Sequence, residues 1–85
     1  MENLQGIHIE VFYGKELQKI TGSASEQMML SSGATFIYLL QCIFMSYPEI
    51  EEKYPPGVLG ILINGTPPTG NMALFEGDKV ELLTH

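Results

Sequence analysis

The chain has 85 residues, a length that suits a single small domain. Hydrophobic residues make up 45% of it, so we expect a folded core rather than a disordered chain. Ten acidic residues against four basic ones give a net charge of -6. This balance disfavours nucleic acid as a partner, because phosphate binding needs a cationic face, and it suits docking on a basic protein surface.

Other features of the sequence narrow the class of protein further. The one cysteine excludes an intramolecular disulfide and a cysteine-rich metal site, and the two histidines stand far apart, so we expect no metal and no cofactor. The longest strongly apolar stretch, residues 35–45, is shorter than the roughly 20 residues that span a bilayer. No apolar run follows a basic segment near the start. We therefore expect a cytoplasmic protein.

The first third of the sequence predicts a hairpin. Ile7, Ile9 and Val11 alternate with more polar neighbours, which is the period-two pattern of a half-buried strand. The polar stretch from Gly14 to Ser23 predicts a turn. Residues 26–30 predict a second strand, which would pair with the first.

A helix is predicted next. Thr35, or a serine shortly before it, suits the N-cap position, and the apolar run that follows predicts a helix from about Phe36 to Ser46. The helix should end near Pro48, because the residue before a proline avoids the helical region. The acidic stretch 49–54 predicts a short turn.

The second half predicts two further strands. The apolar run 58–63 predicts a compact strand, closed by Asn64-Gly65, which is a strong turn signal. A loop rich in proline and glycine follows. Residues 73–75 predict a small edge piece, and the turn 76–78 leads into a last strand over 79–83.

The order of these elements predicts an α+β fold. A hairpin, one helix and a closing strand beside the first strand form a sheet with a helix layer, the arrangement called the β-grasp. We expect one domain over residues 1–85, with a mixed four- to five-stranded sheet and one main helix packed on one face.

Several segments resemble the MoaD/ThiS group of β-grasp sulfur carriers, which includes the small subunit of molybdopterin synthase. The resemblance covers nearly the whole chain and keeps the family's order and spacing. The segments that carry it are Val11-Phe12-Tyr13, Glu16-Leu17, Thr21-Gly22, Gly33-Ala34-Thr35, Leu39-Leu40, Tyr47-Pro48-Glu49, Ile61 to Gly65, and the set Leu74, Gly77, Asp78 and Val80.

The resemblance implies a carrier rather than an enzyme. In the family, an ATP-dependent activating enzyme adenylates a C-terminal glycine. Sulfur then replaces AMP, and the resulting thiocarboxylate donates sulfide to a molybdopterin or thiazole precursor. The implied partner is therefore an activating enzyme or the large subunit of a synthase.

The end of the sequence departs from the family pattern. The family tail ends in Gly-Gly, because only residues without a Cβ thread a narrow channel into the adenylation site. Here Leu82, Leu83, Thr84 and His85 form only a stub of such a tail. Two explanations stay open: a chain shortened before the tail, or a divergent member that kept the fold and lost the chemistry.

The sheet offers a predicted docking patch. If Ile7, Ile9 and Val11 face the helix, then Phe12, Leu62 and Leu83 face outward by alternation. In the β-grasp order their three strands are neighbours, so these side chains would form one partner-binding patch.

The helix offers a second surface. Its predicted core face carries Phe36, Leu39, Leu40, Ile43 and Tyr47. The opposite side carries Tyr38, Gln41, Cys42 and Met45, and no charged residue lies between Gly33 and Pro48. Because a helix that is apolar on nearly all sides is normally covered on both, Tyr38 and Met45 are predicted partner contacts.

Two functions therefore stay open on the sequence. The first is a sulfur-carrier-like protein that docks through its sheet face and C-terminal strand. The second is a non-carrier interaction module that binds through the apolar helix side and forms a homodimer there.

Overall fold

The structure is a computed structural model that describes residues 6–55 and 57–84. His85, predicted as part of the tail stub, lies outside these residues. Seven elements follow one another in the chain: β1 (Gly6–Tyr13), α1 (Lys15–Thr21), β2 (Ser25–Ser31), α2 (Phe36–Ser46), α3 (Pro48–Lys53), β3 (Leu59–Ile63) and β4 (Lys79–Thr84).

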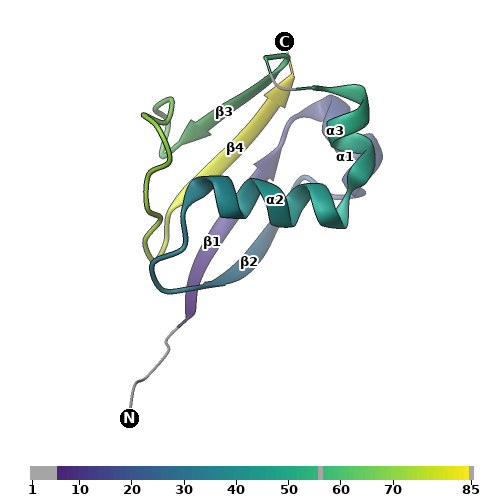
Figure 1. The fold of residues 1–85 in the computed structure, drawn as a ribbon. Helices are drawn as coiled ribbons and strands as arrows, with labels where there is room; N and C mark the ends of the chain where they lie inside the picture. The colour runs from purple at the N-terminus through teal and green to yellow at the C-terminus, as the bar shows by residue number, and fades with distance from the viewer. Residues whose placement is uncertain (1–5, 56, 85) are drawn as a thin grey trace.

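The strands form one mixed four-stranded sheet. Their order is β2-β1-β4-β3. β1 runs antiparallel to β2 and parallel to β4, while β3 is antiparallel to β4. α2 lies across one face of this sheet, and the ends of β1 and β4 that lead to the termini lie at opposite ends of the molecule (Figure 1). The predicted α+β β-grasp arrangement, with its main helix on one face, is confirmed.

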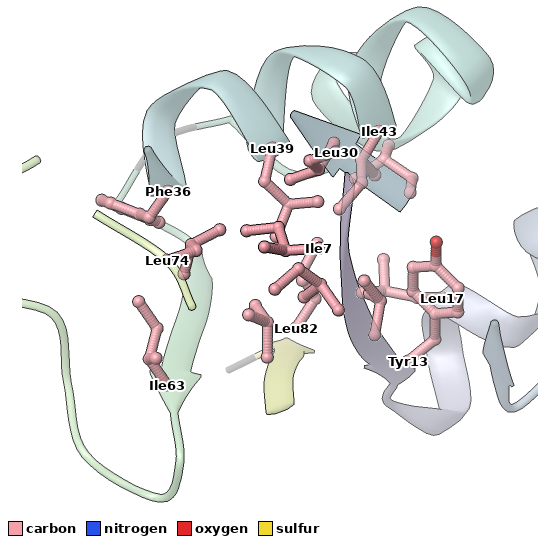
Figure 2. Close-up of a cluster of buried hydrophobic side chains, with 14 residues drawn as sticks. Ile7, Tyr13, Leu17, Leu30, Phe36, Leu39, Ile43, Ile63, Leu74 and Leu82 are labelled. Carbon is pink, nitrogen blue, oxygen red and sulfur yellow. The ribbon is translucent and has the colours of Figure 1, made fainter. Parts of the chain in front are cut away.

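The core lies between the sheet and α2 (Figure 2). Each strand turns alternate residues toward the helix, so the period-two pattern of the sequence becomes one apolar layer. The largest side chains that are fully buried in it are Ile9, Leu17, Leu39, Ile43, Ile50, Leu74, Leu82, Val11 and Val80. Three side chains of α2 belong to the buried set, namely Phe36, Leu39 and Ile43.

The bounds of α2 are those that the sequence predicts. Thr35 is the N-cap, and its Oγ1 accepts a hydrogen bond from the backbone N–H of Tyr38 at 3.3 Å. At the other end, Tyr47 precedes Pro48 and takes non-helical backbone angles. The cap and the proline therefore fix both ends.

The predicted turn between Gly14 and Ser23 is wrong, because most of it forms the helix α1. Leu17 is fully buried and attaches this helix to the core. Gly22 ends it in the left-handed conformation, with φ of 80°, and its N–H donates to the carbonyl of Gln18 at 2.9 Å.

The predicted acidic turn over 49–54 is also wrong, because these residues belong mainly to the helix α3. Pro48 stands in the first turn, where its missing N–H costs no hydrogen bond. Ile50 is fully buried and holds α3 to the core. The domain therefore has two short helices beside its main one.

The predicted edge piece over 73–75 is not a strand. Ala73 makes an isolated bridge to Thr35, and the backbone N–H of Leu74 donates to the carbonyl of Ala34 at 2.9 Å. This segment therefore ties the loop before β4 to the start of α2. Within the described residues the sheet has four strands.

Candidate docking surface

The face of the sheet that points away from α2 carries the predicted patch. Phe12 of β1 lies opposite Glu81 of β4, and Leu62 of β3 lies opposite the same residue. Leu83 lies two residues further along β4, opposite Gly60. All three apolar side chains are half-buried. The structure thus brings Phe12, Leu62 and Leu83 onto three adjacent strands of one face, while their contact with a partner stays a prediction.

Glu81 lies within this patch, and the sequence alone did not indicate it. Its strand lies between the two others, so its Cα has Phe12 as partner on one side and Leu62 on the other. The side chain is half-buried. Only the pairing of the strands identifies Glu81 as part of the patch, because its two apolar neighbours, Phe12 and Leu62, lie on other strands.

A hollow of about 270 Å³ lies on the same face. It is lined by Phe12, Asn64, Gly65, Lys79 and Glu81. The surface is therefore not flat: the first residues of β4 and the Asn64-Gly65 turn border a depression beside Phe12.

The predicted tail stub is part of the sheet as far as Thr84. Leu82 is fully buried in the core, and its carbonyl accepts a hydrogen bond from the N–H of Gly14 at 2.8 Å. Thr84 lies opposite Leu59 of β3. The side chain of Leu82 is thus held in the core, and the end of β4 is anchored on both sides.

The turn before β4 explains the pattern Leu74-x-x-Gly77-Asp78-x-Val80. Leu74 and Val80 are buried. Gly77 has φ of 85°, a conformation that favours glycine. The Asp78 carboxylate accepts from the backbone N–H of Phe75 and from the amide of Asn64, both at 2.9 Å. The pattern therefore builds a turn that positions β4.

The outer side of α2 is exposed and apolar. Tyr38 is 51% exposed, Met45 is 82% exposed, and Ile37 is exposed as well. Cys42 was predicted on this side, but it is half-buried and packs against the core. Phe44 also packs against the core. The exposed apolar surface is therefore narrower than the sequence suggests and centres on Tyr38 and Met45. Their contact with a partner stays a prediction.

A carboxylate shared by two tyrosines lies beneath the C-terminal end of α2. The hydroxyl of Tyr13 donates to Glu26 Oε2 at 2.5 Å, and that of Tyr47 donates to the same atom at 2.9 Å. Burial, followed by the bond to Glu26, raises the pKa of Tyr13 above its usual value. The bond to Glu26 is the main cause that raises the pKa of Tyr47. This cluster, absent from the sequence analysis, is a structural support.

Within 6–55 and 57–84, no group of three or more histidine, cysteine, aspartate or glutamate side chains is placed to hold a metal ion. Over the same residues, no helix is long and apolar enough to cross a membrane.

Solved structures place this architecture among known proteins. Small archaeal modifier protein 1 from Haloferax volcanii is 21% identical and superposes with a TM-score of 0.80, covering 93% of this chain and 98% of its own. A candidate molybdopterin converting factor subunit 1 from Pyrococcus furiosus is 21% identical, with a TM-score of 0.83 and coverage of 92% and 97%. The ubiquitin of Caldiarchaeum subterraneum is 15% identical, with a TM-score of 0.63 and coverage of 95% of both chains.

Comparison of the sequence with known families and proteins finds no match. No model of a protein family matches the chain, and no curated protein is significantly similar to it in sequence. At these identities the solved structures establish the fold, and they agree with the resemblance to MoaD and ThiS at that level. The chain therefore has the ubiquitin-like β-grasp fold that the archaeal modifier, the candidate converting factor subunit and the ubiquitin share.

Proposed function

We propose that this protein is a carrier or modifier of the β-grasp type, not itself an enzyme, that acts in the cytoplasm by docking on a protein partner. The partner is an activating enzyme, or a synthase large subunit that receives what the carrier brings. Two neighbours in fold are named a modifier and a candidate molybdopterin converting factor subunit, which supports both the carrier and the modifier form of the proposal.

One observation carries the proposal: the apolar patch adjoins the end of β4. Leu83 belongs both to the patch and to the last strand, and Phe12 and Leu62 flank that strand on either side. A partner seated on these three side chains would therefore also hold the end of β4. This geometry suits a protein whose C-terminal end is delivered to a partner's active site.

The test joins docking to chemistry. The 85-residue chain and a version extended by a family-like tail ending in Gly-Gly are each incubated with the adenylating enzyme encoded in the source genome. We expect ATP–pyrophosphate exchange and a thiocarboxylate mass gain with the extended chain only, because Thr84 and His85 carry side chains where the channel admits glycine. Both chains should bind the enzyme.

A control variant tests the need for the terminal glycine. The extended chain with its terminal glycine replaced by alanine should bind without exchange. Failure of the extended chain either to bind or to be activated would contradict the carrier proposal. Robust thiocarboxylate formation on the 85-residue chain would instead overturn the expected need for a terminal glycine.

The second candidate is a non-carrier interaction module. Its support is the exposed apolar side of α2, where Tyr38 and Met45 are exposed while Cys42 and Phe44 are half-buried and pack against the core. Such a module would pair through this side, with a second copy as the simplest partner. Self-association that is independent of the sheet face would favour it.

A further inference from the structure

We propose that Glu81 is the receptor for a basic side chain, an arginine or lysine, of the protein that docks on the outer sheet face. The inference rests on the proposed function and adds the chemistry of the partner: an apolar surface with one cation near its centre.

The direct neighbours of Glu81 across the sheet are apolar. Its Cα partners are Phe12 on β1 and Leu62 on β3. Side chains directly opposite one another in a sheet are the ones in closest contact. Among residues 6–55 and 57–84, the carboxylate of Glu81 makes no hydrogen bond and no ion pair. A half-buried carboxylate thus stands in an apolar patch without a partner from the described chain.

One lysine, Lys79, lies near Glu81 on this face. Lys79 lies two residues before Glu81 on β4 and points to the same face, and its Cα partner across the sheet is Glu10. Within the described residues, Lys79 forms an ion pair with neither Glu10 nor Glu81. His8 of β1 lies on this face too and pairs with Glu76 at 3.4 Å. Glu10 and Glu81 are then two carboxylates against the one ammonium group of Lys79, so one carboxylate of this face is in excess.

When a partner docks, the unpaired charge of Glu81 would determine which partner surfaces can bind. An apolar partner surface that covered Phe12, Leu62 and Leu83 would remove Glu81 from water as well. A carboxylate buried without a partner is strongly unfavourable, whereas one that meets a cation is compensated. The surface therefore selects a partner that supplies a positive charge at this point. It discriminates against purely apolar partners and against acidic ones.

The hollow gives this cation a place. It is lined by Phe12, by Lys79 and Glu81 of β4, and by the Asn64-Gly65 turn, and its volume is about 270 Å³. A guanidinium group is weakly hydrated, pairs with carboxylates and stacks on aromatic rings, so an arginine suits a hollow that offers both. A lysine would meet the carboxylate but would gain less from the ring.

The principal experiment measures binding of the adenylating enzyme to the extended chain by calorimetry. We expect Glu81→Gln to weaken binding by about tenfold and Glu81→Lys by about a hundredfold or more, because the second change sets two cations against each other. The affinity of the wild type should also fall with added salt more steeply than that of Glu81→Gln.

Glu52→Gln is the matched control. It removes the same charge from an exposed position on α3, on the helical side of the sheet, and it should leave the affinity unchanged. Circular dichroism and thermal unfolding check that each variant is folded. Wild-type affinity in Glu81→Gln would overturn this inference while leaving the carrier proposal standing. An equal loss in Lys79→Met would overturn it as well, since the partner would then be reading both charges.

A second measurement does not depend on the enzyme. The labelled protein is titrated with the peptide acetyl-Leu-Arg-Leu-amide and with the same peptide carrying citrulline, the neutral analogue of arginine. We expect saturable amide shifts on β1, β3 and β4 with the arginine peptide, at least about threefold weaker binding with citrulline, and the same weakening in Glu81→Gln. Equal binding of both peptides, or no binding of either, would overturn the inference, even where the enzyme docks and is active.

Self-association is tested in parallel, because a second copy could present its own Lys79 to Glu81. Sedimentation of the wild type and Glu81→Lys distinguishes this case. A dimer that Glu81→Lys converts to a monomer would show that the face serves a second copy and would overturn the assignment of a separate basic partner.

Discussion

Asn64 and Asp78 join two turns that lie fourteen residues apart in the sequence. The amide of Asn64 donates to the carboxylate of Asp78 at 2.9 Å, and the backbone N–H of Lys79 donates to the Asn64 side-chain oxygen at 3.0 Å. Asp78 also accepts from the backbone N–H of Phe75. The turn that ends β3 and the turn that begins β4 are thus one hydrogen-bonded unit at one end of the candidate docking face.

This unit predicts a coupled loss of stability. Asp78→Ala should lower the free energy of unfolding by about 1–3 kcal/mol, because it leaves two donors without their charged acceptor. Asn64 has φ of 52°, so Asn64→Gly keeps the backbone conformation and removes only the amide. Urea unfolding of both variants and of the double variant should give a sum that is not additive. Additive losses would mean that the two side chains act independently.

The tyrosine pair predicts a loss of stability at alkaline pH. Because the pKa of Tyr13 is raised from its ordinary value of 10.0, the unfolded chain releases this proton at a lower pH than the folded one. Stability from this group is therefore complete below pH 10 and declines as the pH rises above it. Unfolding free energies measured across this range should show the decline, and tyrosinate absorbance should lag in the folded protein.

Two tyrosine variants test whether Tyr13, and not the tyrosines in general, causes the alkaline loss of stability. Tyr13→Phe should flatten the alkaline decline and cost about 1–2 kcal/mol at neutral pH, since Glu26 loses one donor. Tyr38→Phe removes an exposed hydroxyl and should leave the decline as it is. If both variants behave alike, the Tyr13–Glu26 bond is not its source.

The outer patch should serve binding more than folding. Phe12→Ala and Leu62→Ala should each weaken partner binding by about 1–2 kcal/mol if they are anchors. Their side chains are only half-buried, so the loss of stability should stay below that of Leu39→Ala, a fully buried site where about 2–5 kcal/mol is expected. Calorimetry and chemical unfolding give the two quantities separately. Binding unchanged in both variants would remove the patch from the docking site.

The outer side of α2 predicts self-association. At high protein concentration we expect a dimer by sedimentation, which Tyr38→Lys or Met45→Glu should shift to monomer, because a charge there would be buried unpaired in an interface. Both positions are exposed in the single chain, so circular dichroism should show an unchanged fold. A wild type that stays monomeric at every concentration would leave this apolar side without a binding role.

The long, strongly patterned elements could be predicted from the sequence. β1 alternates over its whole length, and α2 is bounded by an N-cap threonine and a proline, so both were placed correctly. The outward direction of Phe12 and Leu62 followed from alternation alone. These features depend on local rules, which a single sequence expresses directly.

The two short helices could not be predicted in the same way. α1 spans seven residues and α3 six, and each has a single fully buried residue, Leu17 and Ile50 respectively. A helical period needs a longer window than that to stand out. Glu81 was missed for another reason: its meaning depends on the register of three strands, which is a non-local property.

The central position of β4 affects how the protein can fold during synthesis. β4 lies between β1 and β3, yet of the four described strands it is the last to be synthesised. Until then β3 has no neighbour, and β1 is paired only with β2. Formation of the complete sheet therefore waits for residues 79–84, and the outer face and the anchored end of β4 arise together. A nascent chain therefore cannot present the outer face to a partner before the end of β4 is in place.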